Sequence, residues 1–216
     1  MKIQEKENAR ILALFHQIRE RQERDNEHTN YKDAPALHEM ADLIRPYIGK
    51  PEQEDLADIA AVCLFLGNRY REMMRGAYAA EFFTAAFCAA VASVKGTDEE
   101  LEDAEEMFRD AVKARNWYVD DACEDLKQAA AHVMAPEAIE KAFAESAKRT
   151  LKHDPVEMTP EYLAVIDEVE QKVEENMTTH GRGSCHERWA LTREFLEEKG
   201  IKWRSQGAMN PGWRFD

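Results

Sequence analysis

Apolar side chains recur every three or four positions along almost the whole chain, which is the spacing of amphipathic helices. The first apolar stripe contains Ile11, Leu14 and Ile18 and fades near Asn26. The same spacing predicts helices over residues 36–48, 52–74, 77–94 and 185–199, and four further helices between residues 97 and 177. We find no alternating apolar and polar run of strand length. The pattern therefore predicts an all-α protein of about nine helices, stacked as antiparallel hairpins in a solenoid or a bundle.

Several predicted helices carry residues that suit a helix start. Thr97 and Glu100 have the spacing of a capping box, in which each side chain bonds the backbone of the other residue. Pro136 stands where a helix begins, and Thr159 precedes Pro160, whose fixed φ angle suits the first helical turn. We expect Thr159 to cap its helix. The 17 residues from Gly200 onward show no helical spacing.

The composition agrees with a folded, acidic, helical chain. Of 216 residues, 44% are hydrophobic and 33% are charged, which argues against both a disordered chain and a membrane protein. The formal net charge is −14, and an acidic surface repels phosphate, so nucleic-acid binding is not expected. The composition also leaves open an acidic regulator or a nucleic-acid mimic, which would occupy a basic site on another protein.

Location follows from the absence of targeting features. The first 15 residues lack the apolar core and cleavage site of a signal peptide. The most apolar stretch, residues 77–94, includes Glu81 and several small residues, which predicts a buried helix rather than a membrane span. The four cysteines lie far apart with no CxxC pair, and we expect Cys63, Cys88 and Cys123, which fall in helical stretches, to be reduced. We therefore predict a cytoplasmic protein without a membrane partner.

One stretch resembles a known repeat. The matching positions are, in a first helix, Cys63, Leu66, Gly67 and Tyr70, and, in a second helix, Ala79, Phe83 and Ala86. In this respect residues 63–86 are similar to a tetratricopeptide repeat unit. The resemblance implies stacked helix pairs with a concave face that binds a partner, and it carries over no catalytic residue. A plain bundle with small residues at helix crossings explains the same pattern.

The end of the chain differs from the rest in charge and aromatic content. Residues 1–180 are strongly acidic, whereas residues 181–216 have seven basic and five acidic side chains and three of the four tryptophans. We expect both parts to belong to one domain, with residues 201–216 packed into the concave face of the helices. The expected docking residues, for the tail or for a partner, are Tyr70, Phe83, Trp189, Trp203, Trp213 and Phe215. A free tail that another protein recognises is the alternative.

A glycine loop precedes the last predicted helix. Ser184 and Glu187 have capping-box spacing, which would place Cys185 and His186 in the first turn. Free backbone amides at such a helix start attract anions, so we predict an anion or ligand site formed by Arg182, Gly183, Ser184 and Arg188. The same position lowers a thiol pKa, which makes Cys185 a candidate nucleophile with His186 or His180 as its base. Alternatively, the loop is only a tight turn and Cys185 is buried under Trp189.

Two pairs of carboxylates suit a Mg²⁺ site, each pair lying on one helix face. Glu102 and Glu105 form the first pair, and Asp121 and Glu124 form the second. This arrangement resembles the paired acidic motifs of all-α nucleotide pyrophosphohydrolases, which implies metal-dependent hydrolysis. Solvated helix faces in an acidic protein account equally for such pairs, so the sequence assigns no metal and no cofactor.

Taken together, these patterns favour a non-enzymatic module that binds a protein or a peptide, or serves as a scaffold. The enzymatic alternatives are a Mg²⁺-dependent hydrolase on the paired carboxylates and a thiol enzyme at Cys185.

Overall fold

The computed structural model describes residues 2–24, 27–50, 54–118, 120–148 and 150–215. Within these ranges it contains ten α-helices, three short 3-10 helices and no strand, which confirms the predicted all-α class. In chain order the elements are α1 (Glu5–Arg24), η1 (Glu27–Asp33), α2 (Ala34–Ile44), η2 (Arg45–Tyr47), α3 (Leu56–Glu72), α4 (Gly76–Val94), α5 (Ala104–Arg115), α6 (Glu124–Ala130), α7 (Pro136–Lys148), η3 (Pro155–Met158), α8 (Pro160–Asn176), α9 (Ser184–Glu198) and α10 (Gln206–Met209).

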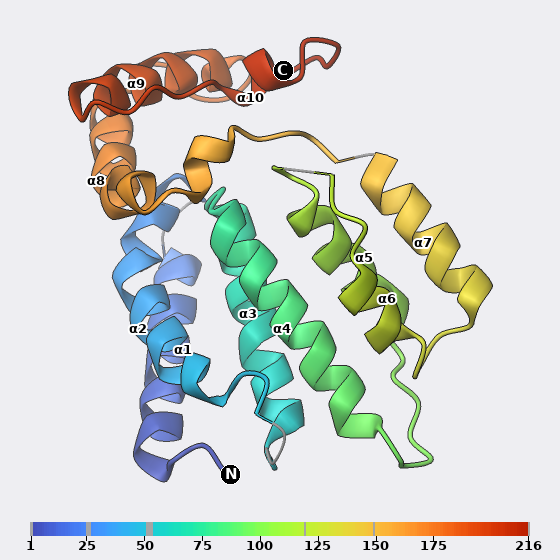
Figure 1. Ribbon diagram of the computed structural model, residues 1–216. Coiled ribbons are helices and arrows are strands. Elements are labelled where there is room, and N and C mark those ends of the chain that lie inside the picture. The colour runs from blue at the N-terminus through green and yellow to red at the C-terminus, as the bar shows by residue number, and fades with distance from the viewer. Residues whose placement is uncertain (1, 25–26, 51–53, 119, 149, 216) are drawn as a thin grey trace.

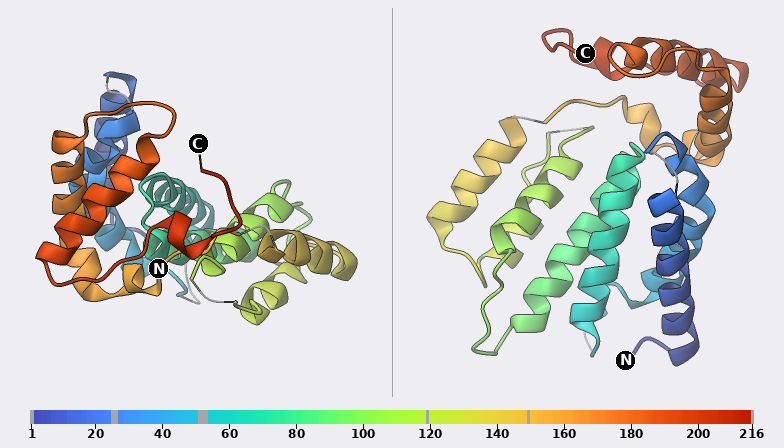
Figure 2. Two further views of the ribbon diagram at one scale, coloured as in Figure 1. Left: turned by 90° about the horizontal axis from the view of Figure 1, so that it is seen from above. Right: turned by 180° about the vertical axis from the view of Figure 1, so that it is seen from behind.

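The helices fall into two groups (Figure 1). Helices α1 to α7 stand side by side in a row, and α8 and α9 lie across one end of that row. The view from above shows that the end of the chain returns across the same end (Figure 2). The buried side chains form two clusters: the larger lies within α1–α7, and the smaller joins α8 to α9 through Tyr162, Ile166, Val169, Val173, Met177, Leu196 and Ile201. The second group therefore has its own small core.

Helices α3 and α4 form the central hairpin, and a glycine lets them approach closely. A Cβ atom added at Gly67 would lie 2.9 Å from the ring of Phe83, so only glycine fits that crossing. Tyr70 and Phe83 are almost completely buried at the same interface. Their prediction as docking residues is therefore wrong, because they fill the space between helices and offer no surface to a partner.

Helix α4 is the apolar stretch identified from the sequence. It is long and apolar enough to cross a membrane by length and composition, yet half of its most apolar window is buried. Phe82, Phe83 and Phe87 each retain 1% exposure or less. In this structure α4 is a core helix, as the sequence predicts.

The predicted helix starts are partly confirmed. Helix α7 begins at Pro136, and the Thr159 hydroxyl accepts a hydrogen bond from the backbone N–H of Tyr162 at the start of α8. The capping box at Thr97 is wrong, because its hydroxyl accepts from the N–H of Glu99 and α5 begins only at Ala104. A local turn has competed successfully with the helix there.

Some predicted boundaries also shift. The helix predicted over 36–48 is α2 followed by the 3-10 helix η2, because Pro46 cannot donate the next helical hydrogen bond. The helix predicted over 52–74 begins at Leu56, and its first two predicted residues lie outside the described ranges. The predicted fade of the first helix near Asn26 also lies outside those ranges.

Candidate binding site

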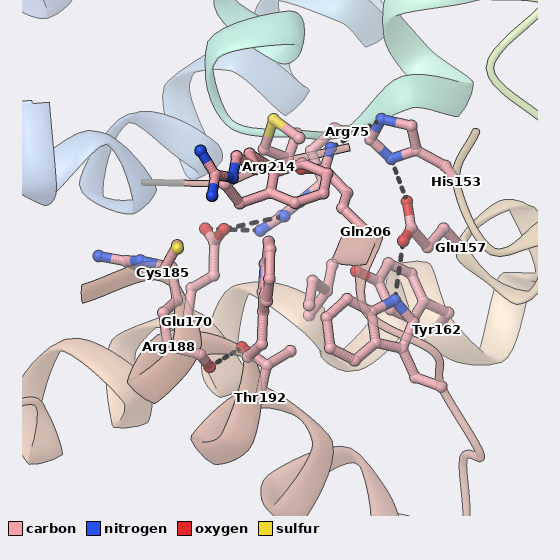
Figure 3. A pocket seen from close by; sticks show the side chains of 15 residues that line it. Arg75, His153, Glu157, Tyr162, Glu170, Cys185, Arg188, Thr192, Gln206 and Arg214 are labelled. Atoms are coloured by element: carbon pink, nitrogen blue, oxygen red, sulfur yellow. Dashed lines mark hydrogen bonds and ion pairs between the residues drawn. The ribbon is translucent and has the colours of Figure 1, made fainter. Parts of the chain in front are cut away.

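A cavity of about 470 Å³ lies where the start of α4, helices α8 and α9 and the end of the chain meet. We call it the aromatic pocket, because Tyr162, Trp189, Trp203 and Phe215 line it. Polar side chains also enter it from several elements, and Figure 3 shows how they lie. Its composition is that of a ligand site: mostly apolar walls with a few converging polar groups.

Arg75 is the cation at the base of the aromatic pocket. It is 2% exposed, and its Nη2 lies 2.7 Å from Oδ1 of Asp167 and 2.8 Å from Oε2 of Glu170. Its Nη1 also donates to the carbonyl of Met73 at 3.0 Å. Burial alone would lower the pKa of Arg75, but the charges of Glu170 and Asp167 outweigh it and raise that pKa. Arg75 is therefore a fixed, neutralised cation that ties α8 to the start of α4.

Asp167 extends this connection to α2 and α3. Its Oδ2 lies 2.9 Å from Nε2 of His38, and the other ring nitrogen of His38 lies 3.0 Å from the hydroxyl of Tyr70. Burial acts to raise the pKa of Asp167, but the hydrogen bond from His38 and the charge of Arg75 together hold it below its usual value. The second group of helices is thus attached to the first by a chain of contacts: the ion pair of Arg75 with Asp167, and the hydrogen bonds of His38 with Asp167 and Tyr70.

A buried histidine–glutamate pair forms another side of the pocket. Nδ1 of His153 lies 3.1 Å from Oε2 of Glu157, and both side chains are almost fully buried. Glu157 also accepts hydrogen bonds from Trp203 Nε1 at 2.7 Å and from the hydroxyl of Tyr118 at 3.2 Å. The amide nitrogen of Gln206 lies 2.9 Å from Nε2 of His153. With that amide donating, the histidine proton sits on Nδ1 and points at Glu157.

The end of the chain, residues 200–215, is held by hydrogen bonds to the connector that precedes α8. We call this stretch the C-terminal segment. Arg204 donates to Asp154 Oδ2 from its backbone N at 2.8 Å and from its Nε at 3.1 Å. Asn210 bonds both the N–H and the carbonyl of Lys152. The segment therefore docks on its own chain, as predicted, but across the end of the helical row rather than in a concave face (Figure 2).

The predicted aromatic docking residues behave differently from one another. Trp203 is half-buried against Glu157, and the rings of Trp189 and Phe215 meet edge to face at 5.1 Å. Trp213 is 55% exposed, so its prediction as a residue that docks the tail is wrong, and its contact with a partner stays a prediction. The Trp213 N–H donates to the carbonyl of Asn210 at 3.0 Å, so Trp213 belongs to a turn between two docked residues, Asn210 and Phe215.

The glycine loop before α9 differs from its prediction. Gly183 is the N-cap with φ +83°, a left-handed conformation that favours glycine, and α9 begins at Ser184. The Glu187 side chain bonds Thr178 and Thr179 instead of the helix start, and these bonds lower the pKa of Glu187 to about 2. The capping box between Ser184 and Glu187 is therefore wrong.

Of the residues predicted for an anion site, Arg182 and Gly183 are exposed in the loop and Ser184 is half-buried. Arg188 lines the aromatic pocket and forms an ion pair with Glu174, which neutralises it. The structure thus brings only one of the four into the pocket.

Cys185 also lines the pocket and is half-buried. Its predicted partner His186 packs edge to face on Trp189 at 5.4 Å between ring centroids. Figure 3 shows Cys185 and Arg188 on one side of the pocket and His153 with Glu157 on the other. The histidine that lines this pocket is therefore remote from the thiol.

Each predicted metal ligand either forms an ion pair with a basic side chain or lies apart from the other predicted ligands. Glu105 pairs with Arg109 at 2.6 Å, and Asp121 pairs with Arg115 at 2.6 Å. The nearest cation to Glu124 is Lys127, at 3.7 Å, and Glu102 is exposed in the turn before α5. Within the described part of the chain, no three His, Cys, Asp or Glu side chains converge in a metal-binding geometry.

The sequence did not indicate Arg75, Glu170, His153 or Glu157. They lie at the start of one helix, within another and in a connector, and only tertiary contacts bring them together. A short polar connector holding His153 and Asp154 ahead of Pro155 was the one local signal available.

Comparison with protein-family models, curated proteins and solved structures yields no match, so the chemistry of this pocket is the guide to function.

Proposed function

We propose that the protein is a non-enzymatic interaction module that binds a segment of a partner protein by taking an apolar side chain into the aromatic pocket. The observation that carries this proposal is the half-open cavity of about 470 Å³ between Trp189, Trp203 and Tyr162. Large aromatic walls contribute most of the binding energy in protein interfaces and cost little conformational entropy.

The charged groups around the pocket support binding rather than chemistry. Arg75 is neutralised by two carboxylates, and Glu157 accepts three hydrogen bonds from Tyr118, His153 and Trp203. A catalytic acid or base needs a proton site that faces the substrate, whereas these groups are committed to their neighbours. They hold the pocket in one shape before a ligand arrives, which lowers the entropic cost of binding.

The central hairpin is consistent with the same role. Residues 63–86, which resemble a tetratricopeptide unit, form two closely packed helices, and the turn between these helices carries Met74 and Arg75, which line the pocket. Such helix pairs commonly serve as rigid supports for peptide-binding surfaces.

Selection of random peptides displayed on phage, followed by fluorescence anisotropy with the selected peptides, tests this proposal. We expect selected peptides to share a large apolar residue. Full burial of such a side chain contributes about 1.5–3 kcal/mol, or roughly 10- to 100-fold in Kd. Replacing that residue with alanine should remove this contribution.

The matched variants are Thr192→Trp and Thr84→Trp. Thr192 lines the aromatic pocket, so a tryptophan there fills it, whereas Thr84 lines a different cavity beside α3. We expect Thr192→Trp to weaken every selected peptide at least tenfold and Thr84→Trp to leave binding unchanged. Equal binding to both variants, or failure to enrich any peptide, would contradict the proposal.

A further inference from the structure

The aromatic pocket continues into a second cavity of about 230 Å³. Met74, Glu170 and Arg188 line both cavities, so the two adjoin. We call the second cavity the acidic hollow, because three glutamates and only one arginine line it: Glu72, Glu170, Glu174 and Arg188. The two cavities together form one elongated groove, with an apolar part and an acidic part.

The acidic hollow retains a negative charge after its ion pairs are counted. Arg188 neutralises Glu174, and Arg69 lies against Glu72. Arg75 faces both Asp167 and Glu170, and the other partner of Asp167 is the ring of His38, so with a neutral His38 one carboxylate charge there has no cationic counterpart. A cation on a ligand would find favourable potential at this place.

The pKa of Tyr31 shows the effect of negative charge at the same place. Burial raises the pKa of this phenol, and the nearby charges of Glu175 and Glu174 raise it further, as expected for a group that resists becoming an anion there. Tyr31 lines the acidic hollow, so the potential acts within the groove itself.

The chain's own end shows which side chain the apolar part accepts. Phe215 lines the aromatic pocket, and its ring meets the ring of Trp189 edge to face at 5.1 Å between centroids. The adjacent Arg214 lines the pocket too (Figure 3). An arginine followed by a phenylalanine from the same molecule therefore already forms part of the wall of the aromatic pocket.

Met74 marks the place where the two cavities meet. Its φ angle of +57° is left-handed, and its side chain is 41% exposed at the turn between α3 and α4. This turn places an apolar side chain in contact with both cavities, so a ligand that spans them would pass over it.

We propose that this groove binds an extended partner segment carrying a phenylalanine-like side chain for the aromatic pocket and a neighbouring basic side chain for the acidic hollow. In this proposal Arg214 and Phe215, which line the aromatic part, act as an internal competitor that such a segment displaces. This inference rests on the proposed function and specifies the chemistry of the partner.

The probe is a fluorescein-labelled synthetic copy of residues 210–215 with an amide end, added to the full-length protein. Two control peptides carry glutamate in place of the arginine, or alanine in place of the phenylalanine. We expect the copy to bind at least fivefold more tightly than either control, with an affinity that falls as salt screens the charges.

Three full-length variants separate the contributions. Phe215→Ala removes the internal competitor, so the copy should bind about threefold more tightly, because the competent fraction of the protein rises. Glu72→Gln should lower the affinity for the peptide copy of residues 210–215. It should leave the affinity for the glutamate control peptide unchanged or slightly higher. Glu137→Gln, at an exposed position on α7, should change neither.

The outcomes are distinguishable from those of the peptide selection. If all three peptides bind alike, or none binds while phage-selected peptides bind and depend on Thr192, this inference is overturned and the proposed function stands. If Thr192→Trp changes the affinity of no peptide, both this inference and the proposed function are wrong. Alkylation of Cys185 with N-ethylmaleimide fills the same pocket without a mutation, and the copy should then bind at least fivefold more weakly.

Discussion

The indole nitrogen of Trp203 donates a 2.7 Å hydrogen bond to Glu157, a carboxylate that is 5% exposed. This contact joins the C-terminal segment to the connector before α8 and places one wall of the aromatic pocket. It satisfies a buried charge that would otherwise be costly, so the position of the segment and the burial of Glu157 depend on each other.

Trp203→Phe keeps an aromatic ring but removes that donor together with part of the indole's apolar surface. Two other donors to Glu157 remain, so we expect a loss of about 1.5 kcal/mol of unfolding free energy, which is the lower end for hydrogen bonds to charged groups. For a chain of this size the melting temperature should fall by roughly 3–6 °C. Differential scanning fluorimetry measures it.

The control for that variant is Trp213→Phe. Trp213 is exposed and makes no side-chain hydrogen bond among the described residues, so its replacement should change the melting temperature by about 1 °C or less. An equal loss in both variants would show that the hydrogen bond from Trp203 to Glu157 adds no measurable stability.

Gly76→Ala tests how tightly the start of α4 packs against Tyr118 and Trp117. A Cβ atom there would lie 2.2 Å from the hydroxyl of Tyr118 and 2.5 Å from Trp117. Tyr118 cannot retreat without losing its bond to Glu157, so we expect about 2–3 kcal/mol of destabilisation. Urea denaturation measures the change. Gly212→Ala, which meets nothing within 4 Å, should leave the midpoint unaltered.

The sequence predicted the all-α class because helix spacing is a local property. Gly67 and Phe83 illustrate this, since their placement on facing helices follows from residues a few positions away. Helix ends were less predictable: Thr159 caps its helix, whereas Thr97 closes a turn seven residues before α5, although both have suitable local sequence. Competing local hydrogen bonds decide between those outcomes.

The candidate site could not be predicted in the same way. Arg75 meets Glu170 across 95 positions of sequence, and no spacing rule relates them. The tail was predicted to dock from its aromatic content, and it does, but its partners are Asp154 and Lys152, in a connector without helical pattern. A long-range charge pair becomes visible only when the fold brings its members together.

Asp154 makes docking of the C-terminal segment sensitive to acid. Burial acts to raise the pKa of Asp154, but hydrogen bonds from Arg204 and from the backbone of Val156 outweigh it and hold that pKa below its usual value. A carboxylate with a depressed folded pKa contributes stability above its unfolded value, near 3.9, and loses it as the pH falls through the folded pKa. We expect the hydrogen-exchange protection factors of residues 202–210, which correct for the intrinsic pH dependence of exchange, to fall below about pH 4.

Asp154→Asn provides the comparison for the acid experiment. The amide retains an oxygen that can accept from Arg204 but carries no charge that titrates. Its C-terminal segment should exchange faster than the wild type at pH 7 and show a flatter dependence on acid. Parallel acid profiles for the two proteins would exclude Asp154 as the group responsible.

Cys185 gives a direct measure of access to the aromatic pocket. Burial raises the pKa of Cys63 to about 12 and that of Cys123 to about 11, so neither reacts readily at neutral pH. Cys185 is half-buried at the pocket, and Cys88 is exposed. In a Cys88→Ser background we expect iodoacetamide at pH 7.5 to modify Cys185 alone, as mapped by mass spectrometry. Thr192→Trp should slow that modification at least fivefold, and labelling of Cys185 no faster than Cys63 would contradict an open pocket.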